Sequence, residues 1–149
     1  MAQRVISQTT CSPEETQDLG IRLARDLRPG DCVALYGDLG SGKTCLIQGI
    51  CEGMRVTDAV TSPTFILINE YAGVDASGAP LPVYHFDLYR LEGPDDLFDL
   101  GCDDYFYGAG VCLIEWAERG EDALPAGAIH IRIDPTGETT RRFTITYPE

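Results

Sequence analysis

The sequence predicts an α/β domain with a mixed β-sheet flanked by helices and a β-hairpin at its C-terminal end. Three observations lead to this fold class. Residues 32–36 (CVALY) form a short, wholly apolar run, which is typical of a buried central strand. A glycine-rich segment and then a helical pattern follow this run directly. Apolar residues alternate with polar ones near the end of the chain, on both sides of a Pro-Thr-Gly turn.

The first helix is expected to begin after Ser12, its N-cap, with Pro13 in the first turn and Glu15 closing a capping box. Leucines recur every four residues from 19 to 27, which gives this helix an apolar face. The Arg-Pro-Gly sequence at 28–30 ends it. The pattern therefore predicts an amphipathic helix directly before the buried strand.

The elements after the glycine-rich segment are read from the same kinds of pattern. A second helix is predicted from residue 43 to about residue 54. Strands at 65–68 and 83–86 are joined by a Gly/Pro/Ala-rich loop at 73–82, which favours an antiparallel hairpin over a helical crossover. The remaining elements, in order, are a short helix with an acidic first turn (94–100), a strand (111–114) and a terminal hairpin of strands 129–133 and 143–147.

Length and composition limit the functions to consider. The 149 residues have the size of a single domain, 1–149, and 44% of them are hydrophobic, as expected of a chain with a core. With 11 basic and 24 acidic side chains, the net charge of −13 argues against direct binding to nucleic acid, which needs a basic surface. No apolar run approaches the roughly 20 residues of a membrane helix, and no signal-peptide core is visible near residue 1. We therefore expect a cytoplasmic protein without a membrane contact.

The cysteines show neither a C-x-x-C pair nor a histidine at zinc-like spacing. Because nothing indicates export, disulfides are not expected either. We predict that all six are reduced and structural: Cys11, Cys32, Cys45, Cys51, Cys102 and Cys112.

Residues 37–44 (GDLGSGKT) match the phosphate-loop motif G-x-x-x-x-G-K-[ST] in full. Glycines let such a loop wrap around a polyphosphate, and the N-terminus of the following helix favours its negative charge. Lys43, the only lysine of the chain, is expected to contact the β and γ oxygens, and the Thr44 hydroxyl is expected to ligate Mg²⁺. The motif narrows the fold to the P-loop NTPase type. The residues predicted to bind the nucleotide are Asp38, Leu39, Gly40, Ser41, Gly42, Lys43 and Thr44.

Acidic residues that end apolar strands are candidates to bind the metal ion and to orient the attacking water. Asp87 and Glu115 both stand at such positions, and the sequence leaves open which of them is the direct metal ligand. Residues 62–65 (SPTF), with Thr64, form a further candidate as a loop that senses the γ-phosphate. Trp116 has two interpretations, core packing or contact with a nucleotide or partner. No chemistry is assigned to either histidine.

Four segments taken together resemble the bacterial TsaE (YjeE) ATPase family of tRNA threonylcarbamoyladenosine biosynthesis. They are residues 35–44 (LYGDLGSGKT), 62–65 (SPTF), 85–91 (HFDLYRL) and 113–118 (LIEWAE). The resemblance implies that the chain binds and hydrolyses ATP. It also implies that the chain acts with TsaD and TsaB to install threonylcarbamoyl on adenosine 37 of tRNAs that read codons beginning with A. The tRNA would be contacted only indirectly, through the complex.

The resemblance also implies roles for single residues. Thr44 and Glu115 would hold Mg²⁺, Asp87 and Trp116 would be needed for activity, and the loop containing Thr64 would act as a switch. None of the four matching segments identifies the residues that contact the adenine base. Residues 10–12 and the turn at 134–141 are plausible neighbours of the base.

Two other functions remain as alternatives. A small-molecule kinase would need clustered arginines around the transferred phosphate, whereas Arg90 and Arg119 stand far apart in the sequence. A nucleotide-sensing adaptor would differ only in not hydrolysing ATP. A GTPase is excluded, because the guanine-reading motif N-K-x-D needs a lysine and the only lysine is Lys43.

Overall fold

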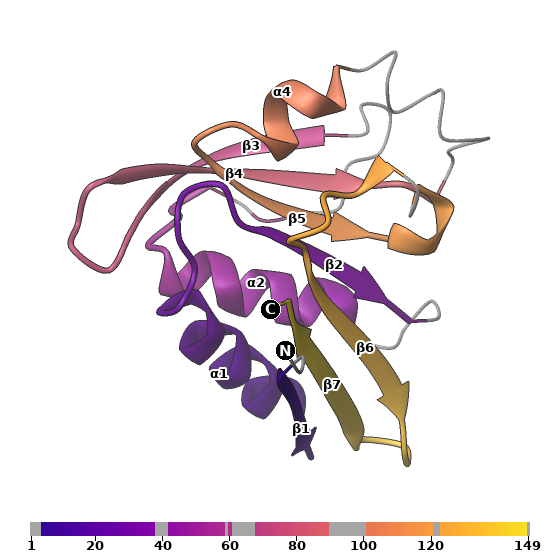
Figure 1. Cartoon of the computed structure of the whole chain (residues 1–149). Helices are drawn as coiled ribbons and strands as arrows, with labels where there is room; N and C mark the ends of the chain where they lie inside the picture. Colours follow the sequence, from indigo (N-terminus) through magenta and orange to yellow (C-terminus); the bar gives the residue numbers. More distant parts are fainter. Residues whose placement is uncertain are drawn as a thin grey trace.

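The computed structural model describes residues 4–37, 42–58, 60, 68–89, 101–120 and 123–148. These residues contain one seven-stranded sheet with helices on both faces (Figure 1). The elements, in chain order, are β1 (Arg4–Thr10), α1 (Pro13–Ala24), β2 (Cys32–Tyr36), α2 (Lys43–Gly53), β3 (Ile68–Val74), β4 (Pro80–Asp87), α4 (Cys102–Phe106), β5 (Val111–Glu115), the 3₁₀ helix η1 (Ala117–Arg119), β6 (Ile129–Pro135) and β7 (Arg141–Tyr147).

The sheet is mixed, as the sequence predicted, with the strand order β1-β7-β6-β2-β5-β4-β3. β2 runs parallel to both β5 and β6, and β4 runs parallel to β5. The outer strands are antiparallel, because β7 pairs with β6 and β1, and β3 pairs with β4. The terminal hairpin, β6 and β7, is thereby confirmed. The four parallel strands in the middle of the sheet all have their carboxyl ends at the same edge.

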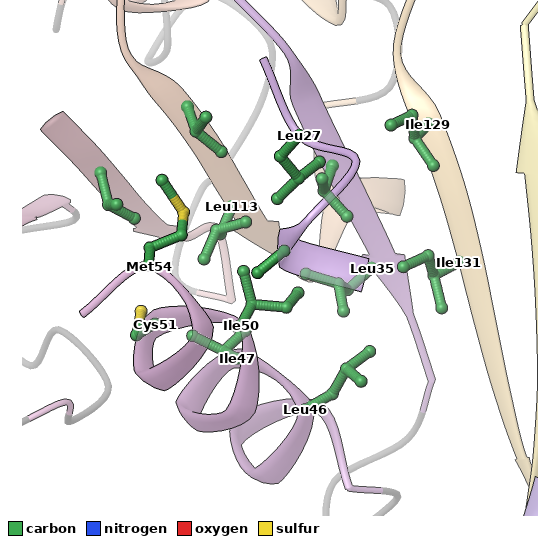
Figure 2. Close-up of a cluster of buried hydrophobic side chains, with 14 of the residues drawn as sticks. Leu27, Leu35, Leu46, Ile47, Ile50, Cys51, Met54, Leu113, Ile129 and Ile131 are labelled. Carbon is green, nitrogen blue, oxygen red and sulfur yellow. The ribbon is translucent and has the colours of Figure 1, made fainter. Parts of the chain in front are cut away.

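The central strand β2 is apolar on both faces because both faces are covered. Val33 and Leu35 belong to the core beneath α1 and α2, whereas Cys32 and Ala34 pack on the opposite side with Phe106 of α4. Figure 1 shows α1 and α2 on one side of the sheet and α4 on the other. Figure 2 shows the core on the α2 side, where Leu46, Ile47 and Ile50 of α2 lie near Leu35 of β2 and Leu113 of β5.

The start of α1 follows the predicted capping pattern with one difference. The Ser12 hydroxyl accepts a hydrogen bond from the Glu15 N–H at 3.1 Å, which confirms Ser12 as the N-cap. The Glu15 carboxylate in turn accepts from the N–H of Cys11 at 2.9 Å, and not from that of Ser12. The box therefore closes one residue earlier than expected and ties the end of β1 to the helix.

The hairpin before residue 90 is confirmed, but its loop is shorter than predicted. β3 and β4 extend through half of the segment 73–82 that was expected to be loop, so that only residues 75–79 connect them. The Asp75 carboxylate closes this turn by accepting the N–H groups of Ser77 at 2.9 Å and Ala79 at 3.0 Å. Of the predicted elements, residues 65–67 and the helix 94–100 lie outside the described residues.

Three elements were not predicted: β1, α4 and the 3₁₀ helix η1. β1 forms one edge of the sheet by pairing with β7, from Arg4 opposite Tyr147 to Thr10 opposite Arg141. Most of its side chains are exposed and several are polar, so that no apolar run marks it in the sequence. α4 has only five residues, which is too short for a helical period to be recognised.

All six cysteines are free, as predicted. Four of them are buried, and burial raises the pKa of Cys51 to about 12, which keeps that thiol protonated and unreactive. Within the described part of the chain, none of the helices combines the length and the apolar character that crossing a membrane requires.

The helices α1 and α2 approach each other so closely that a glycine is needed at the contact. A Cβ atom built on Gly49 of α2 would lie 2.2 Å from the carbonyl oxygen of Gln17 in α1. Backbone atoms cannot move aside as a flexible side chain does. The position of α2 on the sheet, and with it the start of this helix at Lys43, therefore depends on this contact.

We expect Gly49→Ala to lower the free energy of unfolding by about 1–3 kcal/mol, the usual cost of overpacking. The loss should outweigh the higher helix propensity of alanine, which is worth up to about 1 kcal/mol. Urea unfolding followed by circular dichroism measures the change. Gly127→Ala is the control, since a Cβ there meets nothing within 4 Å. Equal stability of the two variants would contradict the close contact.

Candidate functional site

The carboxyl ends of the parallel strands bring four separate segments of the chain together. β2, β4 and β5 point in the same direction in Figure 1, and β6 is parallel to β2. In open α/β sheets, ligands bind just outside this edge. The segments that meet here follow Tyr36, Asp87, Glu115 and Pro135.

The phosphate-loop motif connects β2 to α2, as its mechanism requires. Gly42, at the N-cap of α2, has φ +109°, a conformation that residues with side chains rarely adopt. Its carbonyl accepts the Leu46 N–H at 3.0 Å, which starts the helix. Four residues predicted to bind the nucleotide lie outside the described residues: Asp38, Leu39, Gly40 and Ser41.

Lys43 is 5% exposed and lies at the first position of α2. Its ammonium group donates a hydrogen bond to the carbonyl of Gly37, at the other end of the loop. The same ammonium lies 3.4 Å from the centroid of the Trp116 ring, in a cation–π contact. The two contacts compensate the cost of burying the cation and hold the ammonium group near Gly37, where the phosphate loop begins.

Thr44 lies beside the acid that ends β5. Its hydroxyl donates to Oε1 of Glu115 at 3.2 Å, and Glu115 is 3% exposed. A hydroxyl and a carboxylate are both oxygen groups of the kind that Mg²⁺ binds, so the pair would fit a shared Mg²⁺ ion in its chemistry. Mg²⁺ typically takes one or two protein ligands and completes its shell with phosphate oxygens and water.

Asp87, the other candidate acid, lies directly opposite Glu115 in the register of β4 and β5. Side chains that pair in register point to the same face of the sheet. Oδ1 of Asp87 accepts the N–H of Tyr89 at 3.0 Å, so this carboxylate also shapes the segment that leaves β4. The structure therefore brings both acids to the loop edge and places Glu115 against Thr44.

His85 lies at the site, although the sequence analysis assigned it no chemistry. The imidazole is completely buried, and its Nε2 lies 2.7 Å from Oε2 of Glu115. Its Nδ1 lies 3.4 Å from the hydroxyl of Tyr71. The signal was present in the sequence, because His85 stands two residues before Asp87 and therefore shares its face of the strand.

Trp116 contacts both Lys43 and Tyr89. It adopts φ +56°, and its ring lies against the Lys43 ammonium and, in a tilted arrangement, 5.0 Å from the Tyr89 ring. The Arg119 guanidinium lies 5.3 Å from the centroid of Tyr89, which is half exposed. The structure contains both features behind the two interpretations of Trp116, since the ring packs against the core on the α4 side of the sheet and also contacts Lys43.

A cavity of about 240 Å³ opens beside the N-terminus of α2. It lies between the start of α1 and the turn that joins β6 to β7, so that three distant segments form its wall. The Arg141 guanidinium holds the turn by donating to the carbonyls of Gly137, Glu138 and Thr140. The lining residues are Ser12, Pro13, Thr16, Gly42, Cys45, Glu138, Thr139 and Arg141.

One predicted part of the site cannot be placed. The loop at 62–65, with Thr64, lies outside the described residues. Its role as a switch therefore stays a prediction.

The central strand β2, the helix that begins at Lys43 and Thr44, and the acid at the end of the neighbouring parallel strand have the arrangement of a P-loop α/β protein. Comparison with known proteins agrees with this class and narrows it. The family model "Threonylcarbamoyl adenosine biosynthesis protein TsaE" matches residues 10–143. The chain belongs to the TsaE family of threonylcarbamoyladenosine biosynthesis.

Individual relatives support the assignment over nearly the whole chain. The tRNA threonylcarbamoyladenosine biosynthesis protein TsaE of Bacillus subtilis is 44% identical over 137 residues, covering 92% of this chain and 82% of the relative. The protein of the same name from Treponema pallidum is 37% identical over 134 residues, with 90% and 95% covered. The crystal structure of Bacillus subtilis YdiB superimposes with a TM-score of 0.84 at 38% identity, covering 100% of this chain and 89% of that one.

Proposed function

We propose that this chain binds ATP with Mg²⁺ at its phosphate loop and hydrolyses it. Together with TsaD and TsaB, it would thereby serve threonylcarbamoylation of adenosine 37 in tRNAs that read ANN codons. The contact that carries the proposal is the 3.2 Å pair of Thr44 and Glu115 at the start of α2. A hydroxyl and a carboxylate are oriented there beside a buried ammonium, which is the donor set of a P-loop enzyme.

Each group would have a distinct task. The Lys43 ammonium would bind β- and γ-phosphate oxygens, and the first N–H groups of α2 would donate to them. Thr44 and Glu115 would hold the Mg²⁺ ion, whose charge offsets the charge that develops on the leaving phosphate. Asp87, on the same face and opposite Glu115, would orient the attacking water.

The cavity beside α2 is where the adenosine would lie. It adjoins Gly42, so that a nucleotide with its phosphates in the loop would extend its base toward Ser12 and the 135–141 turn. These segments are the ones that the sequence suggested as neighbours of the base. The cavity has a volume of about 240 Å³ and would receive part of the nucleoside.

The charge of the chain supports an indirect role toward tRNA. With a net charge of −13, the chain would be repelled by a phosphate backbone. The relatives named above are biosynthesis proteins of a tRNA modification. We infer that this chain supplies the ATP-dependent step while TsaD and TsaB contact the tRNA.

Lys43→Ala should lower ATP affinity tenfold or more, equivalent to at least about 1.4 kcal/mol. The reason is the loss of the one ammonium at the phosphate loop. Isothermal titration calorimetry measures the affinity, and circular dichroism checks the fold. Arg4→Ala also removes a cation, but at the opposite edge of the sheet, and should bind ATP like the wild type. Unchanged affinity in Lys43→Ala would contradict the phosphate-loop assignment.

Glu115→Gln should still bind ATP, but its turnover in the presence of TsaD and TsaB should fall by roughly 10²-fold, as when a preorganised electrostatic contact is lost. Phosphate release, assayed with and without the partners, measures this effect. The wild type alone should hydrolyse slowly, because P-loop enzymes often need a partner to complete the site.

Asp87→Asn is the companion variant and should also lower turnover. If Glu115→Gln turned over like the wild type, the metal role would pass to Asp87. If the wild type released no phosphate even with its partners, the chain would be a nucleotide-sensing adaptor.

ATP should protect Cys45 from alkylation, because this thiol lines the cavity proposed for adenosine. Burial and the nearby Glu14 raise the pKa of Cys45, so its reactive thiolate forms at higher pH than usual and the assay needs alkaline conditions. The measurement is the rate of iodoacetamide labelling by mass spectrometry, in a Cys11→Ser background that removes the exposed thiol.

Inorganic triphosphate, which would fill only the phosphate loop, is the control ligand and should protect Cys45 less than ATP. GTP should also protect less, since no guanine-reading motif exists in the chain. Equal protection by all three would show that the cavity does not receive the base.

A further inference from the structure

His85 and Glu115 form a buried pair behind the oxygen atoms that face the phosphate loop. His85 is completely buried, and Glu115 is 3% exposed. The two oxygens of the Glu115 carboxylate have different neighbours: Oε1 lies 3.2 Å from the Thr44 hydroxyl, and Oε2 lies 2.7 Å from Nε2 of His85. One oxygen thus faces the nucleotide site while the other is held from inside the protein.

The direction of the bond between His85 and Glu115 follows from the chemistry of the groups. An ionised carboxylate only accepts, so Nε2 of His85 carries the hydrogen that it shares with Glu115. On the other side of the ring, Nδ1 is hydrogen-bonded to the Tyr71 hydroxyl at 3.4 Å. The Asn69 side-chain amide donates to the Tyr71 oxygen at 3.3 Å. Successive hydrogen bonds therefore connect β3, through His85 of β4, to the carboxylate of Glu115.

We propose that His85 is a positioning residue for the metal site, fixing the Glu115 carboxylate so that Oε1 faces the cation shared with Thr44. The proposal rests on the function proposed above. The strands supply the geometry, because β3, β4 and β5 are neighbours and carry Asn69 and Tyr71, His85 and Glu115 respectively. Without His85, Oε2 would be buried beside an apolar side chain, and the carboxylate would turn toward water and away from Thr44.

The side chain of Glu115 keeps rotational freedom that the pairing of its strand does not remove. Its backbone is fixed by the sheet, but a glutamate side chain has three rotatable bonds beyond the backbone, and each added constraint narrows the positions of its oxygens. Groups that orient a metal ligand from behind commonly change metal affinity 10–100-fold when they are removed. A change of this size in metal affinity can be distinguished from the loss of stability that poorer packing alone would cause.

The test compares His85→Leu with His85→Gln. Leucine fills most of the space without a donor, whereas the glutamine amide can still donate to Oε2. The first readout is the ratio of the ADP dissociation constants in EDTA and in saturating Mg²⁺, from calorimetry. The second is the number and affinity of Mn²⁺ ions bound to the ADP-loaded protein, from electron paramagnetic resonance.

His85→Leu should lower Mn²⁺ affinity about tenfold or more, and the ADP ratio should fall with it. His85→Gln should recover most of both values. ADP affinity in EDTA should be the same in all these proteins, because the lysine and the loop are untouched. Tyr71→Phe, which removes only the hydroxyl that fixes the ring, should shift Mn²⁺ affinity in the same direction by a smaller factor.

Val83→Ala is the control for packing. Val83 lies on the same face of β4, two residues before His85, and is equally buried, but it belongs to the apolar core. This variant should lose stability without losing Mn²⁺ affinity. If His85→Leu and Val83→Ala behaved alike, or if His85→Gln were as weak as His85→Leu, the positioning role would be overturned.

Glu115→Gln in the same assays separates this proposal from the proposed function. If Glu115→Gln weakened Mn²⁺ binding while His85→Leu did not, the positioning role of His85 would be wrong and the proposed function would stand. If Glu115→Gln left Mn²⁺ binding unchanged, Glu115 would not hold the metal, and both proposals would be overturned.

Discussion

The parallel pairing of β2 with β5 is the constraint on which the site depends. Their register sets Leu35 opposite Glu115, so the loop that leaves β2 and the acid that ends β5 emerge at the same edge of the sheet. A shift of one residue would turn Glu115 to the other face, into the cluster of Cys112 and Ile114 and away from Thr44. The apolar cores on the two faces fix this register, because every alternate residue of both strands is buried against helices.

The site also joins two buried charges to neighbours that offset their burial. Lys43 is held by a backbone carbonyl and an aromatic ring, and Glu115 by an imidazole and a hydroxyl. An uncompensated charge at either position would be costly in a water-poor environment. Each neighbour that offsets a charge also fixes its position. Stability and geometry at this site therefore depend on the same contacts.

Local patterns in the sequence predicted a large part of this arrangement. The apolar run of β2, the phosphate-loop motif and the cap of α1 are each encoded within a few residues. The structure confirms the strand and the cap, and it places Gly42, Lys43 and Thr44 of the motif at the start of α2. β1 was missed because backbone pairing with β7, and not an apolar pattern, defines it. The loop between β3 and β4 was predicted too long, since the Asp75 turn needs only five residues.

The sequence by itself determined the class of fold, the phosphate loop with Lys43 and Thr44, and the resemblance to the TsaE family, which the comparisons confirmed. Tertiary structure alone decided which candidates meet. Asp87 and Glu115 look alike in the sequence because both end apolar strands, and only the packing of α2 against β5 sets Thr44 beside Glu115. His85 acquires its role in the same way, from the pairing of β4 with β5. The physical reason is that a hydrogen bond depends on distance in space, and partners 30 or 71 residues apart leave no local pattern in the chain.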